Sequence, residues 1–127
     1  MSVDYSDMSK LSKLDSKKVD AFMQSLTKEL GLRVLTKSKK LTPVKTGYLR
    51  RGWHASDVSM LNGDYMLEVS NPVEYAPYVE YGHRTNRGGW SEGYFMATQA
   101  SKDVEEHADE ICKKKLVRFL KVEAFND

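Results

Sequence analysis

The sequence predicts an α+β fold in which a long helix, an antiparallel β-hairpin, a short helix and a second long helix follow one another. Apolar residues recur at helical spacing near both ends of the chain. Between them, two strand-like runs flank Asn62-Gly63, a dipeptide suited to a type I′ hairpin turn. Since 127 residues fill one core, we expect a single domain over 15–122, with a flexible arm at 1–14 and a tail at 123–127.

The first helix is expected to begin at Asp15 or Ser16, either of which can cap a helix start. Its apolar residues share one face: Val19, Phe22, Met23, Leu26, Leu30 and Val34. Gly31 interrupts the pattern at a cost of about 1 kcal/mol relative to alanine, so a bend or local fraying is expected there. The helix should end at Thr42, because the residue before Pro43 is driven out of the helical region.

A loop over 41–51 leads to the hairpin, whose strands are predicted over 53–61 and 64–70. The turn sets three pairs on one mainly apolar face: Met60 with Tyr65, Val58 with Leu67, and Ser56 with Val69. The same register sets two acids, Asp57 and Glu68, opposite each other and places Trp53 on their polar face. Two facing carboxylates could indicate a cation site or an acid/base pair, but a solvated or subunit-facing sheet surface, or a bulge that shifts the register, is the stronger interpretation.

The second half of the chain is predicted to be mainly helical. Residues 73–82 form a short helical turn stopped by Gly82, and the glycine-rich stretch 83–93 is expected to be a mobile loop. The last helix is predicted over 94–122, with an apolar stripe made of Ala97, Ala100, Val104, Ala108, Ile111, Cys112, Leu116, Phe119 and Leu120.

No residue pattern in the chain predicts catalysis or a cofactor. The sequence has no phosphate-binding glycine loop, nucleophile elbow or zinc-binding HExxH. The acidic segment 105–110 (EEHADE) is the nearest to a metal site, but a solvated helix face followed by lysines for pairing is the stronger interpretation. His54 and His83 lack triad partners, and the single Cys112 is interpreted as a small core hydrophobe. We therefore expect a protein that is not an enzyme.

The formal net charge of +2 is too small to indicate a nucleic-acid-binding protein as a whole. The basic segment 37–51, with Tyr48 and Trp53 available to stack on bases, nevertheless makes a small DNA-binding module the alternative hypothesis. The N-terminal residues lack the apolar run of a signal peptide, so we expect no membrane association and a place in the cytoplasm or in an assembly made there.

Two motifs, TPVKTGYLRRGW at 42–53 and YAPYVEYG at 75–82, followed by GYFMATQA at 93–100, resemble the tail-completion or head-tail joining proteins of long-tailed bacteriophages. The positions that match the first motif are Pro43, Val44, Thr46, Gly47, Leu49 and Arg50. The positions that match the second are Tyr75, Ala76, Tyr78, Val79, Glu80 and Gly82.

The resemblance implies a structural virion protein that acts without a cofactor, as a neck or minor tail protein. The resemblance implies that copies of the protein form a ring, expected to be a hexamer. This ring joins the DNA-filled head to the tail or completes the upper end of the tail. The implied partners are neck or head-closure proteins and tail-terminator or tail-tube proteins. Genomic DNA passes nearby without specific binding, and assembly takes place in the host cytoplasm.

Ring interfaces between identical copies use two different surfaces of each copy. The hairpin edge and the 84–93 loop are the expected surfaces, and Glu80 is expected to pair with arginines of the two loops across copies. The tyrosines of the second motif fit an interface or ordinary packing of the short helix about equally well. The interface candidates are Thr46, Gly47, Arg50, Trp53, Tyr75, Tyr78, Glu80, Tyr81, Gly82, Arg84, Arg87 and Trp90.

Overall fold

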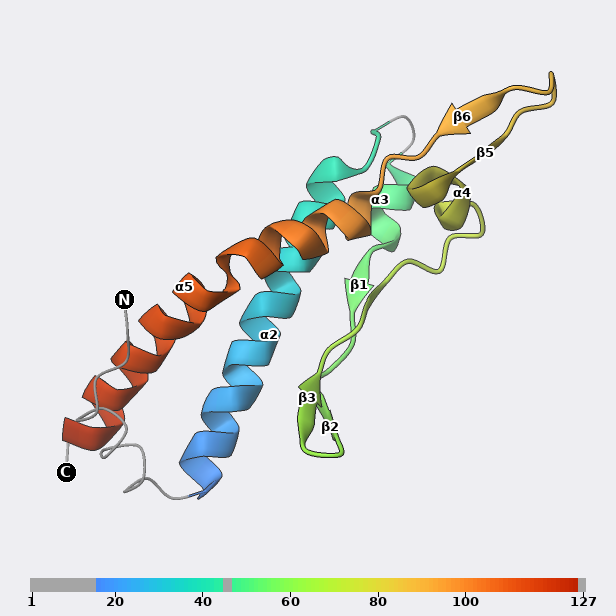
Figure 1. Cartoon of the computed structure of the whole chain (residues 1–127). Coiled ribbons are helices and arrows are strands. Elements are labelled where there is room, and N and C mark those ends of the chain that lie inside the picture. The colour runs from blue at the N-terminus through green and yellow to red at the C-terminus, as the bar shows by residue number, and fades with distance from the viewer. Residues whose placement is uncertain (1–15, 45–46, 126–127) are drawn as a thin grey trace.

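The computed structural model describes residues 16–44 and 47–125, and side chains up to residue 122. The predicted arm at 1–14 lies outside the described residues. Two long helices, α2 (Ser16–Leu41) and α5 (Met96–Phe125), lie side by side and run in opposite directions, with the strands β1 to β4 along another side of α2 (Figure 1). The predicted α+β order of long helix, small antiparallel sheets, short helix and long helix is confirmed.

Eight shorter elements lie between the two long helices. They are α3 (Tyr48–Gly52), β1 (His54–Ala55), β2 (Ser59–Leu61), β3 (Asp64–Met66), β4 (Val69–Ser70), α4 (Ala76–Tyr81), β5 (Gly82–Arg84) and β6 (Trp90–Glu92). The strands pair as three separate two-stranded sheets, β1 with β4, β2 with β3 and β5 with β6.

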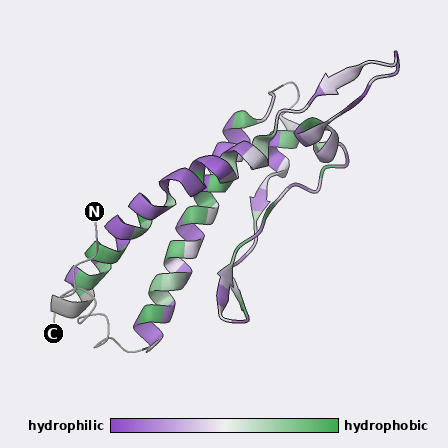
Figure 2. Ribbon diagram, in the orientation of Figure 1, coloured by the Kyte–Doolittle hydropathy of each residue, from purple (hydrophilic) through white to green (hydrophobic). Residues whose placement is uncertain are grey.

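The long helices pack through apolar side chains spaced at helical intervals. The rings of Phe22 and Phe119 stack with centroids 4.5 Å apart, and Leu26 and Leu120 are buried. Figure 2 shows apolar and polar residues alternating along both helices, as expected of amphipathic helices. Helix α5 continues to Phe125, three residues beyond the predicted end at residue 122.

Gly31 does not interrupt α2, which is helical throughout, so the expected local fraying is absent there. A Cβ atom at this position would collide with the side chain of Leu67, which comes from the segment between β3 and β4. The missing side chain therefore lets the hairpin segment lie directly against the helix. The same side of the hairpin is tied to α2 by a hydrogen bond from the Tyr65 hydroxyl to the Asp20 carboxylate.

The predicted hairpin register is confirmed near the turn, where Met60 lies opposite Tyr65. Further along it is wrong by one residue, because Ala55 rather than Ser56 lies opposite Val69. The chain takes four steps from Ala55 to Ser59 but three from Met66 to Val69, so the first strand carries one extra residue. This bulge removes the like-charge pair of Asp57 and Glu68. Instead the Ser56 hydroxyl accepts a hydrogen bond from the Glu68 amide.

Two segments predicted to be loops contain regular structure. The 41–51 segment includes the one-turn helix α3. The 83–93 segment forms the hairpin β5–β6, which projects from the end of the molecule (Figure 1). Its turn is closed by a bond from the Thr85 amide to the Gly89 carbonyl and another from the Gly89 amide to the Thr85 hydroxyl, while Gly88 adopts a φ of 80°. The threonine hydroxyl and the Gly88 backbone are the turn features that the prediction overlooked.

The main core lies at the end of the molecule where α3, α4 and the start of α5 meet, which we call the motif end. Its buried side chains are Leu49, Trp53, Val73, Ala76 and Met96. The predicted short helix is confirmed as α4, which ends at Gly82 with a φ of 88°. No helix among the described residues combines the length and the apolar character needed to cross a bilayer.

Candidate functional site

A buried polar chain joins α2 to the segment after α3. The Trp53 indole N–H donates to the Thr42 hydroxyl oxygen at 2.8 Å, and that hydroxyl donates to the Ser38 carbonyl at 2.6 Å. Trp53 is only 6% exposed. The sequence predicted that Trp53 begins a strand and that its ring contacts another copy or stacks on DNA bases, both of which need an exposed ring. The structure corrects this prediction, because the strand β1 begins at His54 and Trp53 is buried. Its ring is needed inside the chain, where its one polar atom is satisfied.

Glu80 caps the first turn of α5. Its Oε1 accepts from the Ala97 amide at 3.0 Å, while Oε2 accepts from the Thr98 amide at 3.0 Å and the Thr98 hydroxyl at 2.7 Å. Amide groups at a helix start have no partner within the helix, and the positive end of the helix dipole favours a carboxylate there. With 7% of its surface exposed, Glu80 is used within the chain rather than by the arginines expected to pair with it.

Asn71 and two glycines complete this network, and none of their roles was predicted. The Asn71 amide donates to the Leu49 carbonyl at 2.7 Å, and its side-chain oxygen accepts from the Val73 amide at 3.1 Å. A Cβ on Gly52 would strike Asn71, and one on Gly93 would strike the backbone of α4. The Asn71-Pro72 dipeptide was the available signal, because asparagine often bonds to the backbone two residues later.

The tyrosines of the second motif lie on the surface of the motif end. Tyr78 is 59% and Tyr81 63% exposed, and Tyr75 is also exposed. Tyr75 lies near the ring of Tyr48 at 6.5 Å, and Tyr81 near the ring of Phe95 at 6.4 Å. The interpretation of these tyrosines as core residues of the short helix is therefore wrong. We call the group of exposed rings the aromatic surface, formed by Tyr48, Tyr75, Tyr78, Tyr81, Trp90, Tyr94 and Phe95.

The remaining candidates divide between structural and exposed positions. Gly47 precedes α3 with a φ of 70°, and half-buried Arg50 donates to the Thr42 carbonyl at 3.3 Å. Arg84 and Arg87 are exposed in the β5–β6 hairpin. Thr46 lies outside the described residues.

The acidic segment of α5 is exposed, as expected of a solvated face. Glu110 pairs with Lys114 at 3.2 Å, one of the lysine contacts that the sequence suggested. The His107 Nδ1 lies 2.8 Å from the Asp103 carbonyl oxygen, and that bond, together with the Asp103 carboxylate, raises the pKa of His107 above 6.5. Within the described ranges, no group of three or more His, Cys, Asp or Glu side chains is placed to hold a metal ion.

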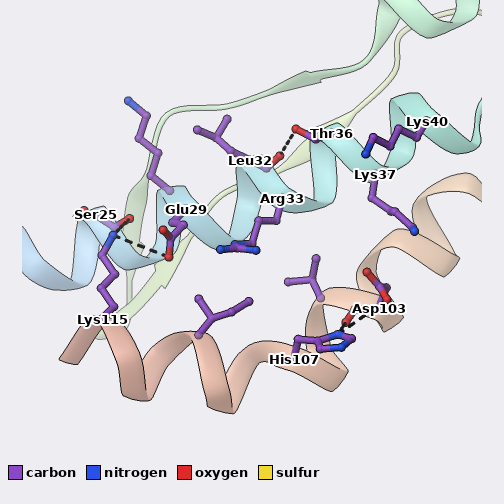
Figure 3. A pocket seen from close by; sticks show the side chains of 13 residues that line it. Ser25, Glu29, Leu32, Arg33, Thr36, Lys37, Lys40, Asp103, His107 and Lys115 are labelled. Carbon is purple, nitrogen blue, oxygen red and sulfur yellow. Dashed lines mark hydrogen bonds and ion pairs between the residues drawn. The ribbon is translucent and has the colours of Figure 1, made fainter. Parts of the chain in front are cut away.

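A groove of about 730 Å³ lies between α2 and α5, and we call it the interhelix groove. Figure 3 shows Arg33 and Lys37 extending from α2 toward α5, with His107 and Asp103 on the opposite side. Its apolar lining comes from Leu32, Val104 and Ile111. Two lysines of the predicted basic segment, Lys37 and Lys40, therefore contribute to a groove that the sequence did not reveal.

Comparison with protein families matches residues 7–82 to the HK97-gp10-like family, described as "Bacteriophage HK97-gp10, putative tail-component". The matched range includes both sequence motifs. The match thus places the chain in a family of bacteriophage tail components. It belongs to the HK97-gp10-like family, which confirms the resemblance. No curated protein matches the chain, and no solved structure does.

Proposed function

We propose that the protein is a neck or minor tail protein that forms a ring, which joins the head to the tail or completes the upper end of the tail. Membership of a family described as a tail component supports a structural role in the tail. Partners of this ring are head-closure proteins on one side and tail-terminator or tail-tube proteins on the other. The finished location is the virion, after assembly in the host cytoplasm.

The aromatic surface is the observation that supports this proposal best. Tyrosine and tryptophan are enriched in protein interfaces because their rings bury a large area with few rotatable bonds. Here seven aromatic residues are exposed at one end of a small chain, on α3, α4, the β5–β6 hairpin and the residues before α5. The buried bonds of Trp53 and Glu80 hold these elements in place, so the surface is presented on a rigid base.

The proposal is tested by adding purified protein to tails assembled without it and measuring their joining to filled heads by electron microscopy and infectivity. Wild-type protein should restore joining, and the double variant Tyr78→Ser, Tyr81→Ser should lose it while keeping its circular dichroism spectrum and Tm. Val122→Ser removes an exposed apolar residue far from the aromatic surface and is the matched control. Failure of the wild-type protein to bind tails or heads contradicts the proposal.

DNA binding is the second candidate, favoured by the positive charge in the interhelix groove. Lys28, Arg33, Lys37 and Lys40 line the groove, and within the described part of the chain none of them forms an ion pair. Against it, Trp53 is buried and cannot stack on bases. Affinity for duplex DNA that falls steeply with salt supports this candidate, whereas no binding at low salt removes it.

A further inference from the structure

The charges between residues 28 and 83 are segregated along the sequence. Residues 52–83 contain no lysine or arginine, and their acids are Asp57, Asp64, Glu68, Glu74 and Glu80. Residues 28–51 contain eight lysines and arginines and one acid, Glu29. The chain as a whole is almost neutral, so the exposed acids of the hairpin segment form a negative patch and the exposed basic residues of α2 a positive one, while buried Glu80 belongs to neither.

The negative patch coincides with an apolar surface on the β2–β3 hairpin. Cross-strand partners share a face of the sheet, so Tyr65 and Met60 lie on the side toward α2. Leu61 and its partner Asp64 therefore lie on the outer side, together with Met66. All three are exposed. We call these three residues the hairpin tip.

The positive patch coincides with the interhelix groove, whose floor is apolar. Leu32 is 42% exposed there, although it is a leucine in the middle of α2. Around it stand the basic side chains of Lys28, Arg33, Lys37 and Lys40, as Figure 3 shows for the labelled ones, and none of them forms an ion pair with a residue that the structure describes. The groove thus offers an apolar centre with a rim of net positive charge, since five basic side chains, counting Lys115, line it against two acids, Glu29 and Asp103. The hairpin tip offers apolar side chains with a carboxylate.

We infer that the hairpin tip of one copy docks into the interhelix groove of the next copy. Leu61 and Met66 cover Leu32 and the apolar wall of α5, while Asp64 meets the basic rim. Each copy then uses two different surfaces, which makes the contact heterologous, and repetition of such a contact closes a ring when the rotation permits. This inference rests on the proposed ring and identifies the contact between its copies.

A second copy fits this groove better than a nucleic acid because the groove has an apolar floor as well as a charged rim. Leu32, Val104 and Ile111 gain from covering apolar side chains and offer nothing to a phosphate backbone. One hairpin buries a small area, so a single contact between two free copies is weak. Binding to a tail raises the local concentration of neighbouring copies and stabilises the closed ring.

Photo-crosslinking tests the contact directly. The full chain carries p-benzoylphenylalanine in place of Leu61 and is irradiated both as concentrated protein and on tails completed with it. Peptide mapping should locate the crosslink on α2 and α5 of another copy, around Leu32 and Ile111. The same probe in place of Val122, an equally accessible apolar residue, should not reach the groove. Capture of another face, or of no second copy in either sample, overturns the inference.

Exchange of charges gives an independent test with a restoring control. Asp64→Lys and Lys37→Glu should each weaken self-association roughly tenfold in sedimentation at low salt, because each places like charges in contact. In an equimolar mixture, the unaltered hairpin of the Lys37→Glu variant meets the unaltered groove of the Asp64→Lys variant, and the two altered surfaces carry opposite charges, so the mixture should regain most of the wild-type association. Asp109→Lys reverses a charge on α5 outside the groove and should associate as wild type does.

The two proposals fail in distinguishable ways. If wild-type protein completes tails while both charge variants do so equally well and the Leu61 probe captures no groove, the docking contact is wrong and the function stands. If the probe captures the groove but the protein neither binds tails nor restores joining, the contact stands and the proposed function is wrong.

Discussion

The two ends of the helix pair are held together by different kinds of interaction. At the motif end, directed hydrogen bonds from Trp53 and to Glu80 fix buried groups in one arrangement. At the far end, the stacked rings of Phe22 and Phe119 and the buried Leu120 supply contacts without direction. Hydrogen bonds depend on geometry and apolar contacts mainly on area. The motif end is therefore where small changes of shape should cost most.

This difference fits the proposed roles of the two ends. The elements that carry the aromatic surface at the motif end include α3 and α4, which pack in the bonded core, so the backbone beneath many of its rings is held in place. An interface formed by preorganised side chains loses less entropy on binding than one that must first be ordered. The far end carries no comparable group of exposed rings among the described residues, and a precise arrangement is not required there.

The largest loss of unfolding free energy is expected for Trp53→Ala. Truncating a buried aromatic side chain costs about 3–5 kcal/mol, and this one also leaves the Thr42 hydroxyl without its donor. Trp90→Ala is the matched control, since Trp90 is 57% exposed and its loss should change the unfolding free energy by less than about 0.5 kcal/mol. Urea unfolding followed by circular dichroism measures both. Equal effects of the two substitutions would show that Trp53 is not a core residue.

Glu80→Ala should cost somewhat less, about 3 kcal/mol of unfolding free energy, because the first amides of α5 lose a charged, buried acceptor. Glu92→Ala removes an exposed carboxylate from the neighbouring hairpin and should change the unfolding free energy little. Hydrogen exchange at the Ala97 and Thr98 amides should accelerate in the Glu80 variant alone. Unchanged protection of these amides would contradict the capping role.

The fold was predictable from the sequence because its main signals are local. Helical spacing predicted α2 and α5, and Asn62-Gly63 predicted the turn and the pairing of Met60 with Tyr65. A bulge that shifts the register was one of the possibilities that the sequence allowed, but its position could not be predicted. It depends on how Leu67 and Tyr65 meet α2, which is a contact between distant parts of the chain.

The candidate site was harder to predict because the motif mixes two kinds of residue. Buried Trp53 ends the first motif and buried Glu80 stands beside exposed Tyr75 and Tyr78 in the second. Sequence alone named all four as interface candidates. Burial is set by packing against α2 and α5, which are remote in sequence. The interhelix groove escaped prediction for the same reason, since its walls are more than sixty residues apart in the chain.

A smaller loss of unfolding free energy is expected for Phe119→Leu at the far end. Exchanging one large apolar side chain for another in a half-buried contact should cost less than about 1.5 kcal/mol, because no directed bond is lost. Trp53→Phe is the corresponding conservative change at the motif end, and it should cost more because it removes the donor to Thr42. Unfolding curves of the two variants compare the ends directly. A reversed order would contradict the distinction drawn between them.

The smallest expected effect on stability is the pH dependence that comes from His107, which is exposed on α5 between the two ends. Its raised pKa means that the folded state binds the proton more tightly than the unfolded state. The resulting stabilisation is fully present below the unfolded value of 6.5 and disappears as the pH rises through the folded pKa. NMR titration of the imidazole should show the raised pKa. Asp103→Asn should reverse only part of the shift, because the larger cause is the bond to the Asp103 carbonyl, which the substitution preserves. A full return to 6.5 in this variant would assign the shift to the carboxylate instead.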